Sequence, residues 1–259
     1  MTGNPPVRVT VRSRPGTVRD VTSGVIKDAG APERAPVSAG RPAWWALAVA
    51  LVVGCLVTAD VLARGRLERF DLQVSEVISG WGLRDSGAFP FVWLVTQLGG
   101  RVAILAVLAV LVGYLAWRRH TWLPLLRVLV ALGLLTLVVY AIKHGTGRTA
   151  PGFPGAYFFH EDGASFPSGH VANAVLMWGV ARWQAVEYGL PIRVQRTFWL
   201  LSVLGPVATG LAMVSLDFHW ITDAVVGACV GLLLLGVVHV LDAAVLSRFV
   251  RARAGRQTA

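Results

Sequence analysis

A series of long apolar runs constrains the fold of this chain more than any other feature. Runs of 17 residues or more with few charges are long enough to cross the hydrocarbon core of a bilayer as helices. The runs lie at about 43–63, 101–117, 121–142, 168–187, 197–216 and 219–246. With 55% apolar and 15% charged residues, the chain is also too apolar for an ordinary soluble domain. We therefore expect an all-α, polytopic membrane helical bundle of about six transmembrane helices over residues 42–247.

Two segments between the first and second runs are expected to lie at the membrane surface. Residues 64–88 mix charges with apolar residues at helical spacing, which predicts an interfacial amphipathic helix. Residues 89–98 are apolar but too short to cross a bilayer alone. This second segment is predicted to be a re-entrant or interfacial piece leading into the next span.

Basic tails flank the predicted membrane domain. Residues 1–41 contain Pro, Gly, Ser, Thr and scattered Arg with no helical apolar period, which predicts a disordered basic tail. Residues 248–259 form a second basic tail. A cleavable signal peptide is not expected, because the first apolar run begins near Ala43 and is long enough to span.

The distribution of Arg and Lys predicts the orientation. Six spans place both termini on one side, and the positive-inside rule favours cytoplasmic termini because the tails and the turns at 118–119 and 182–196 are rich in Arg. The chain is then a multi-pass protein of the cell membrane. Several polar side chains at the other helix ends would share the extracytoplasmic face: Lys143, Arg148, His170, His219 and Asp223.

The net charge of +10 raises the alternative of nucleic-acid binding. The Lys and Arg residues lie mainly in the tails and short loops, and no basic helix or aromatic-basic surface is present in the sequence. The pattern excludes nucleic acid as the expected partner and favours membrane lipids.

Two short clusters carry the candidate chemistry, at 167–170 (Pro-Ser-Gly-His) and 219–223 (His-Trp-Ile-Thr-Asp). On a helix, His219 and Asp223 share one face, so the carboxylate can hold the imidazole. A Ser-Gly-His step that opens a helix offers unpaired backbone N–H groups to an anion. Together the clusters predict phosphate chemistry by histidine beside a bilayer.

These motifs resemble those of the type 2 phosphatidic acid phosphatase superfamily, membrane lipid phosphatases related to vanadium haloperoxidases. The family has Lys, six residues and Arg-Pro; then Pro-Ser-Gly-His; then Ser-Arg, five residues, His, three residues and Asp. The second motif is complete at 167–170, and the third retains His219 and Asp223. The first corresponds to 143–151, beginning at Lys143.

Two arginines of the family pattern are absent. Ala150 stands at the first position, and Met213 stands at the second, after Ala212. Arg148 is the expected substitute for the first, while Asp217 would add negative charge near His219. Losing a charge-assisted contact to a buried phosphate costs roughly 1.5–3 kcal/mol. Such a loss would lower activity, change the preference between monophosphate and diphosphate, or mark a protein without hydrolytic activity.

The resemblance implies a role for each of three catalytic residues. His219 would attack phosphorus and form a phosphohistidine. Asp223 would accept the other ring N–H and stabilise the imidazolium. His170 would protonate the leaving oxygen and then help to activate water.

The resemblance also implies an anion site that needs no metal. Lys143 and Arg148, with Ser168 and the Gly169 backbone N–H, would stabilise the phosphoryl oxygens. Structural alternatives remain for these residues. The less favoured alternative for the two cations is an interfacial position where they touch lipid phosphates, and Ser168 is also a good helix N-cap.

The expected activity is hydrolysis of a lipid phosphate or diphosphate, such as phosphatidic acid, phosphatidylglycerol phosphate or a polyprenyl (undecaprenyl) diphosphate. Three alternatives stay open. The phosphohistidine could pass its phosphate to an alcohol, or the protein could bind lipid phosphates without turnover. A metal could instead be held by His170, His219 and Asp223.

Overall fold

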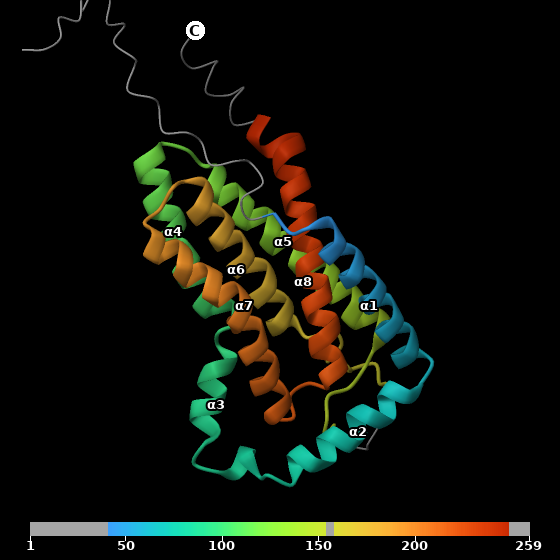
Figure 1. The fold of residues 1–259 in the computed structure, drawn as a ribbon. Coiled ribbons are helices and arrows are strands. Elements are labelled where there is room, and N and C mark those ends of the chain that lie inside the picture. Colours follow the sequence, from blue (N-terminus) through green and yellow to red (C-terminus); the bar gives the residue numbers. More distant parts are fainter. Residues whose placement is uncertain (1–40, 154–157, 249–259) are drawn as a thin grey trace, which may run out of the picture. The chain divides into compact units, whose positions relative to one another are not determined.

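The computed structural model describes residues 41–153 and 158–248, and the elements named within them are all helices. The predicted tails at 1–41 and 248–259 lie outside the described residues, apart from Arg41 and Arg248. Six long helices alternate in direction along the chain (Figure 1). They are α1 (Trp44–Leu62), α4 (Arg101–Arg119), α5 (Leu123–Thr146), α6 (Gly169–Glu187), α7 (Ile192–Ser215) and α8 (Ile221–Leu241), the last extended by a π-helical turn, η2 (Asp242–Leu246).

Five of these helices are long and apolar enough to cross a membrane, where the sequence analysis predicts about six. They are α1, α4, α5, α7 and α8 with η2. The difference lies in α6, which is surrounded by protein and buries polar side chains such as Asn173 and Gln184. A helix that meets other helices on most of its surface does not need a lipid-facing apolar stripe. The all-helical, multi-span architecture is otherwise as predicted.

The remaining helices lie between α1 and α4 in the sequence. The predicted amphipathic segment forms α2 (Arg66–Ser79) and a 3₁₀ turn, η1 (Leu83–Asp85), and the short apolar segment forms α3 (Phe89–Thr96). α3 packs against α7, and α2 contacts both α7 and α8 near the ends that carry the motifs (Figure 1). The surface segments therefore touch the elements that carry the candidate site.

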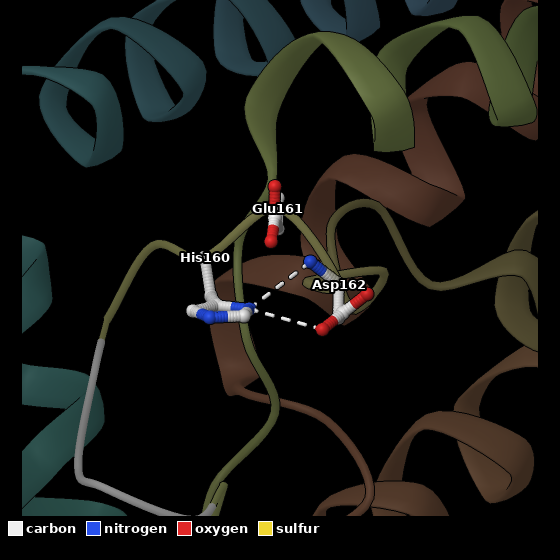
Figure 2. A group of neighbouring side chains, drawn as sticks. All are labelled: His160, Glu161 and Asp162. Atoms are coloured by element: carbon white, nitrogen blue, oxygen red, sulfur yellow. Dashed lines mark hydrogen bonds and ion pairs between the residues drawn. The ribbon is translucent and has the colours of Figure 1, made fainter.

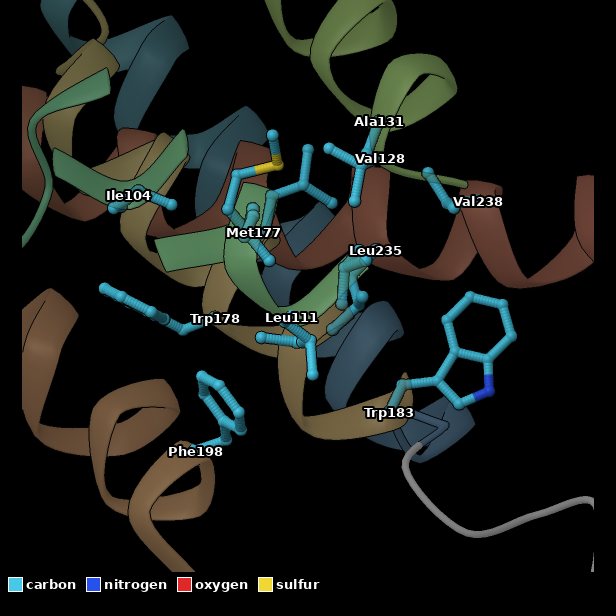
Figure 3. Packing of buried hydrophobic residues seen from close by; sticks show 14 of the residues in the cluster. Ile104, Leu111, Val128, Ala131, Met177, Trp178, Trp183, Phe198, Leu235 and Val238 are labelled. Atoms are coloured by element: carbon cyan, nitrogen blue, oxygen red, sulfur yellow. The ribbon is translucent and has the colours of Figure 1, made fainter. Parts of the chain in front are cut away.

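The hydrophobic core surrounds α6. Figure 3 shows Met177 and Trp178 of α6 among side chains from α4, α5, α7 and α8. Helices associate in membranes through close packing, so small residues at their contacts bring backbones together. At Gly227 of α8, an added Cβ would lie 2.5 Å from the carbonyl oxygen of Ser168. This close approach fixes the start of α8 against the start of α6.

The helix boundaries differ most from the predicted spans at α7. This helix begins at Ile192, whereas the predicted span begins at residue 197. Pro191 precedes the first turn, which carries Arg193. Proline just before or within a first turn favours helix initiation, so the charged residues assigned to a loop belong to the helix.

Candidate active site

A cavity of about 560 Å³ lies where α5 ends and α6 and α8 begin. Four of the predicted site residues line it: Lys143, Gly169, His170 and His219. The other three, Arg148, Ser168 and Asp223, are buried behind its wall. The structure thus brings the residues of three separate sequence motifs to one end of the bundle.

His219 is held by the first turn of α8. Its Nδ1 lies 3.2 Å from Oδ2 of Asp223, which is fully buried. The same carboxylate oxygen accepts a hydrogen bond from the Trp220 backbone N–H at 3.1 Å and so caps the helix. Because Nδ1 faces the carboxylate, Nε2 is the ring nitrogen left for chemistry in the cavity.

Ser165 contacts both His219 and Asp223. Its hydroxyl lies 3.1 Å from Nδ1 of His219 and donates a hydrogen bond to the Asp223 carboxylate. Ser165 is buried and also lines the cavity. Ser165 is not among the predicted site residues, because it lies in the loop before the Pro-Ser-Gly-His motif and matches no motif position.

Arg148 contacts two carboxylates and does not line the cavity. Its Nη1 lies 2.5 Å from Oδ1 of Asp223 and 2.6 Å from Oγ1 of Thr222, and its Nη2 lies 2.6 Å from Oδ2 of Asp71. The guanidinium is fully buried. Its charge therefore compensates Asp71 and Asp223, whereas the sequence analysis expects it on the phosphate.

Asp71 joins α2 to the buried residues Arg148 and Thr222. Its carboxylate accepts the Thr222 hydroxyl and lies 3.2 Å from the Thr222 backbone nitrogen. Burial raises the pKa of the Asp71 carboxyl, while the hydrogen bonds from Thr222 and Arg148 oppose that rise. No local pattern in the sequence links α2 with these residues, which explains why Asp71 is not predicted.

The start of α6 is fixed by its cap and by α8. The Ser168 hydroxyl accepts the Val171 backbone N–H at 3.5 Å, as expected of an N-cap, and the Ser168 backbone N–H donates to the Asp223 carbonyl at 2.9 Å. These contacts place His170 at the cavity. Lys143, which also lines the cavity, donates a hydrogen bond to the Ala164 carbonyl.

Asp217 faces α2, although the sequence analysis expects its charge near His219. Its carboxylate accepts hydrogen bonds from the hydroxyls of Ser75 at 3.1 Å and Ser79 at 2.7 Å. Arg84 donates to the backbone carbonyls of Leu216, at 2.5 Å, and of Asp217, at 2.6 Å. The α2–η1 segment therefore holds the loop that leads into His219.

A possible metal-ligand group lies in the loop before α6. Ligand atoms of His160, Glu161 and Asp162 lie within 4.8 Å of one another (Figure 2). The two carboxylates are exposed, and His160 Nδ1 accepts a hydrogen bond from the Asp162 backbone N–H at 3.1 Å. Among the described residues, His170, His219 and Asp223 do not form such a group. The arrangement gives no support to the metal alternative at the two histidines.

Comparisons with known proteins agree with the motifs. The PAP2 superfamily profile matches residues 124–245. Phosphatidylglycerophosphatase B of Bacillus subtilis (strain 168) is 31% identical over 150 residues, which cover 57% of this chain and 72% of the relative. The chain belongs to the PAP2 superfamily. This PAP2 protein is therefore a multi-pass membrane phosphatase.

A solved structure shares the fold of this PAP2 phosphatase. It is the crystal structure described as the first transmembrane PAP2 type phosphatidylglycerolphosphate phosphatase from Bacillus subtilis, with a TM-score of 0.64 and 23% identity. The match covers 78% of this chain and 98% of that chain. The similarity therefore extends beyond the profile match, which begins in α5.

Proposed function

We propose that this PAP2 phosphatase hydrolyses a lipid phosphate or diphosphate and that His219 is its nucleophile. The observation that carries the proposal is the cavity that His219 and His170 share with Lys143, with His219 held by Asp223. Phosphatidylglycerophosphatase B, the relative from Bacillus subtilis, supports an amphiphilic phosphate as the substrate class.

The proposed reaction has two steps. His219 Nε2 attacks phosphorus, the bond to the leaving oxygen breaks, and His170 gives that oxygen its proton. Water then attacks the phosphohistidine and loses a proton to His170, and inorganic phosphate leaves. Asp223 stabilises the positive charge that develops on the His219 ring in the first step.

The anion site is divided between residues that contact phosphate and residues behind them. Lys143 and the Gly169 backbone N–H line the cavity, so they are the proposed contacts of the phosphoryl oxygens. Ser168 and Arg148 are buried and position the elements that carry His170 and Asp223. No step in this scheme uses a metal.

The proposed orientation places the cavity on the extracytoplasmic face and both chain ends in the cytoplasm. The cavity lies at the end of α5 and the starts of α6 and α8, so these ends share one side of the bundle. The basic pair Arg118 and Arg119 ends α4, which begins at the cavity with Arg101. Arginines beside spans favour the cytoplasmic side.

Phosphate release by purified protein in detergent tests the proposal. The substrates are phosphatidic acid, phosphatidylglycerol phosphate and a polyprenyl diphosphate, each with and without chelator. His219→Ala and His170→Ala should lose at least about 10²-fold in rate. His144→Ala is the matched control, because His144 adjoins Lys143 but does not line the cavity. Turnover by both active-site variants at the wild-type rate would contradict the proposal, and binding without turnover would favour a lipid-phosphate-binding protein.

A further inference from the structure

We propose that Arg101 binds the substrate phosphate and takes the place of the arginines absent at Ala150 and Met213. This inference rests on the proposed phosphatase function. Arg101 is the first residue of α4 and lies outside all three sequence motifs. It lines the same cavity as His170 and His219.

The charge of Arg101 is available for a ligand, unlike that of Arg148. Among the described residues, ion pairs within 4.0 Å join Arg148 to Asp71 and Asp223, whereas no such pair involves Arg101. Arg101 is exposed at the cavity, and Arg148 is fully buried behind it. A phosphate entering the cavity would meet the first guanidinium and not the second.

A close backbone contact brings Arg101 to His170. Two residues before Arg101, a Cβ added to Gly99 would lie 2.5 Å from the carbonyl oxygen of His170 and 2.5 Å from Cγ2 of Thr209. Only glycine allows the turn before α4 to approach α6 and α7 so closely. The contact places the start of α4 directly against the residue proposed to protonate the leaving oxygen.

Two side chains of α6 hold that turn in place. Asn173 Nδ2 donates to the Gly99 carbonyl at 2.9 Å, and Trp178 Nε1 donates to the Leu98 carbonyl at 2.8 Å. Asn173 itself lines the cavity and is buried, and its Oδ1 has no hydrogen-bond partner among the described residues. Arg101 is therefore presented to the cavity by a turn anchored on the helix that carries His170.

The charge of the cavity supports the same assignment. Of the two positions where the family arginines are absent, Ala150 lines the cavity without a charge, and Met213 is buried and does not line it. The charged residues among the described lining residues are Lys143 and Arg101, with one carboxylate, Asp162. A planar guanidinium can donate two parallel hydrogen bonds to phosphate oxygens, so Arg101 supplies the contact that the motifs lack.

The test compares Arg101→Ala, Arg101→Lys and Arg118→Ala with wild type. Arg118 is the matched control, because it lies on the same helix at the end away from the cavity. Two quantities are measured in detergent: kcat/KM for phosphate release, and the rise in Tm caused by orthovanadate, a phosphate analogue. Arg101→Ala should lower kcat/KM roughly 10- to 100-fold and weaken orthovanadate binding about 10-fold or more. Arg101→Lys should fall between it and wild type, and Arg118→Ala should match wild type.

The two measurements separate this inference from the proposed function. Wild-type kcat/KM and orthovanadate binding in Arg101→Ala, with His219→Ala inactive, would overturn the role of Arg101 and leave the proposed function standing. If the wild type showed no His219-dependent turnover, the proposed function would fail. Loss of the orthovanadate effect in Arg101→Ala, with the Tm of the ligand-free protein unchanged, would still support Arg101 as the anion-binding residue.

Discussion

Arg148 Nη1 lies 2.5 Å from Asp223 Oδ1, and the pair is fully buried behind the wall of the cavity. The other guanidinium nitrogen, Nη2, contacts Asp71 of α2. One cation therefore links the interfacial helix to the carboxylate that holds His219. This link makes the fold of α2 part of the support for the proposed nucleophile.

Replacing Arg148 should destabilise the protein more than it weakens phosphate binding. Arg148→Ala leaves Asp71 and Asp223 buried without their cation, which costs about 3–5 kcal/mol. We expect a large fall in Tm in detergent and a fall in kcat, because Asp223 loses its position. An unchanged Tm with a raised KM would indicate that Arg148 binds substrate directly.

Ser165 should contribute modestly to the rate. Its hydroxyl contacts both His219 Nδ1 and the Asp223 carboxylate, so Ser165→Ala removes hydrogen bonds without removing a charge. A net loss of about 0.5–1.5 kcal/mol corresponds to a fall in kcat of roughly 2- to 13-fold. Steady-state kinetics of the variant check this value, with Ser202→Ala, on the exposed part of α7, as control. A loss as large as that of His219→Ala would assign Ser165 a more direct role.

Arg84 should position the loop before His219 without touching substrate. It donates hydrogen bonds to the carbonyls of Leu216 and Asp217, and its guanidinium lies 5.2 Å from the centre of the Phe218 ring. Arg84→Ala should lower kcat about 3- to 10-fold with little change in KM, because two charge-assisted contacts at a partly exposed site are lost.

The control for Arg84 is Arg69→Ala, since Arg69 is an exposed arginine of α2. Equal effects of the two substitutions would indicate that general surface charge, and not the contact with the loop, supports the rate. A higher KM in Arg84→Ala alone would instead place Arg84 near the substrate.

The parts of the site that depend on local spacing could be predicted from the sequence. The expected contact between His219 and Asp223, four residues apart, is present, but His219 lies just before α8, so the contact forms at the capped start of the helix and not along one helix face. The N-cap role of Ser168 is likewise a local property of the Ser-Gly-His step. Apolar length was enough to locate all six long helices, although α6, which protein surrounds, is less apolar than the other five.

The contacts between distant segments could not be predicted in this way. Arg148 and Asp71 are 77 residues apart, and nothing in a single sequence pairs a loop arginine with one particular carboxylate. In the sequence, Arg101 is only a charged residue at the start of a predicted span. Its position beside His170 depends on the packing of Gly99 against α6. The contacts of these residues form only when the helices pack against one another, so the sequence alone does not show them.

The central claim, that His219 forms a covalent intermediate, is tested most directly by trapping it. The wild-type protein in detergent is mixed with a lipid phosphate labelled with ³²P on the terminal phosphate, quenched in alkali within milliseconds, and digested for mass spectrometry. We predict label on His219, released as inorganic phosphate when the quench is delayed, and no label in His219→Ala. Hydrolysis by His219→Ala at the wild-type rate, or label on another residue, would contradict the account.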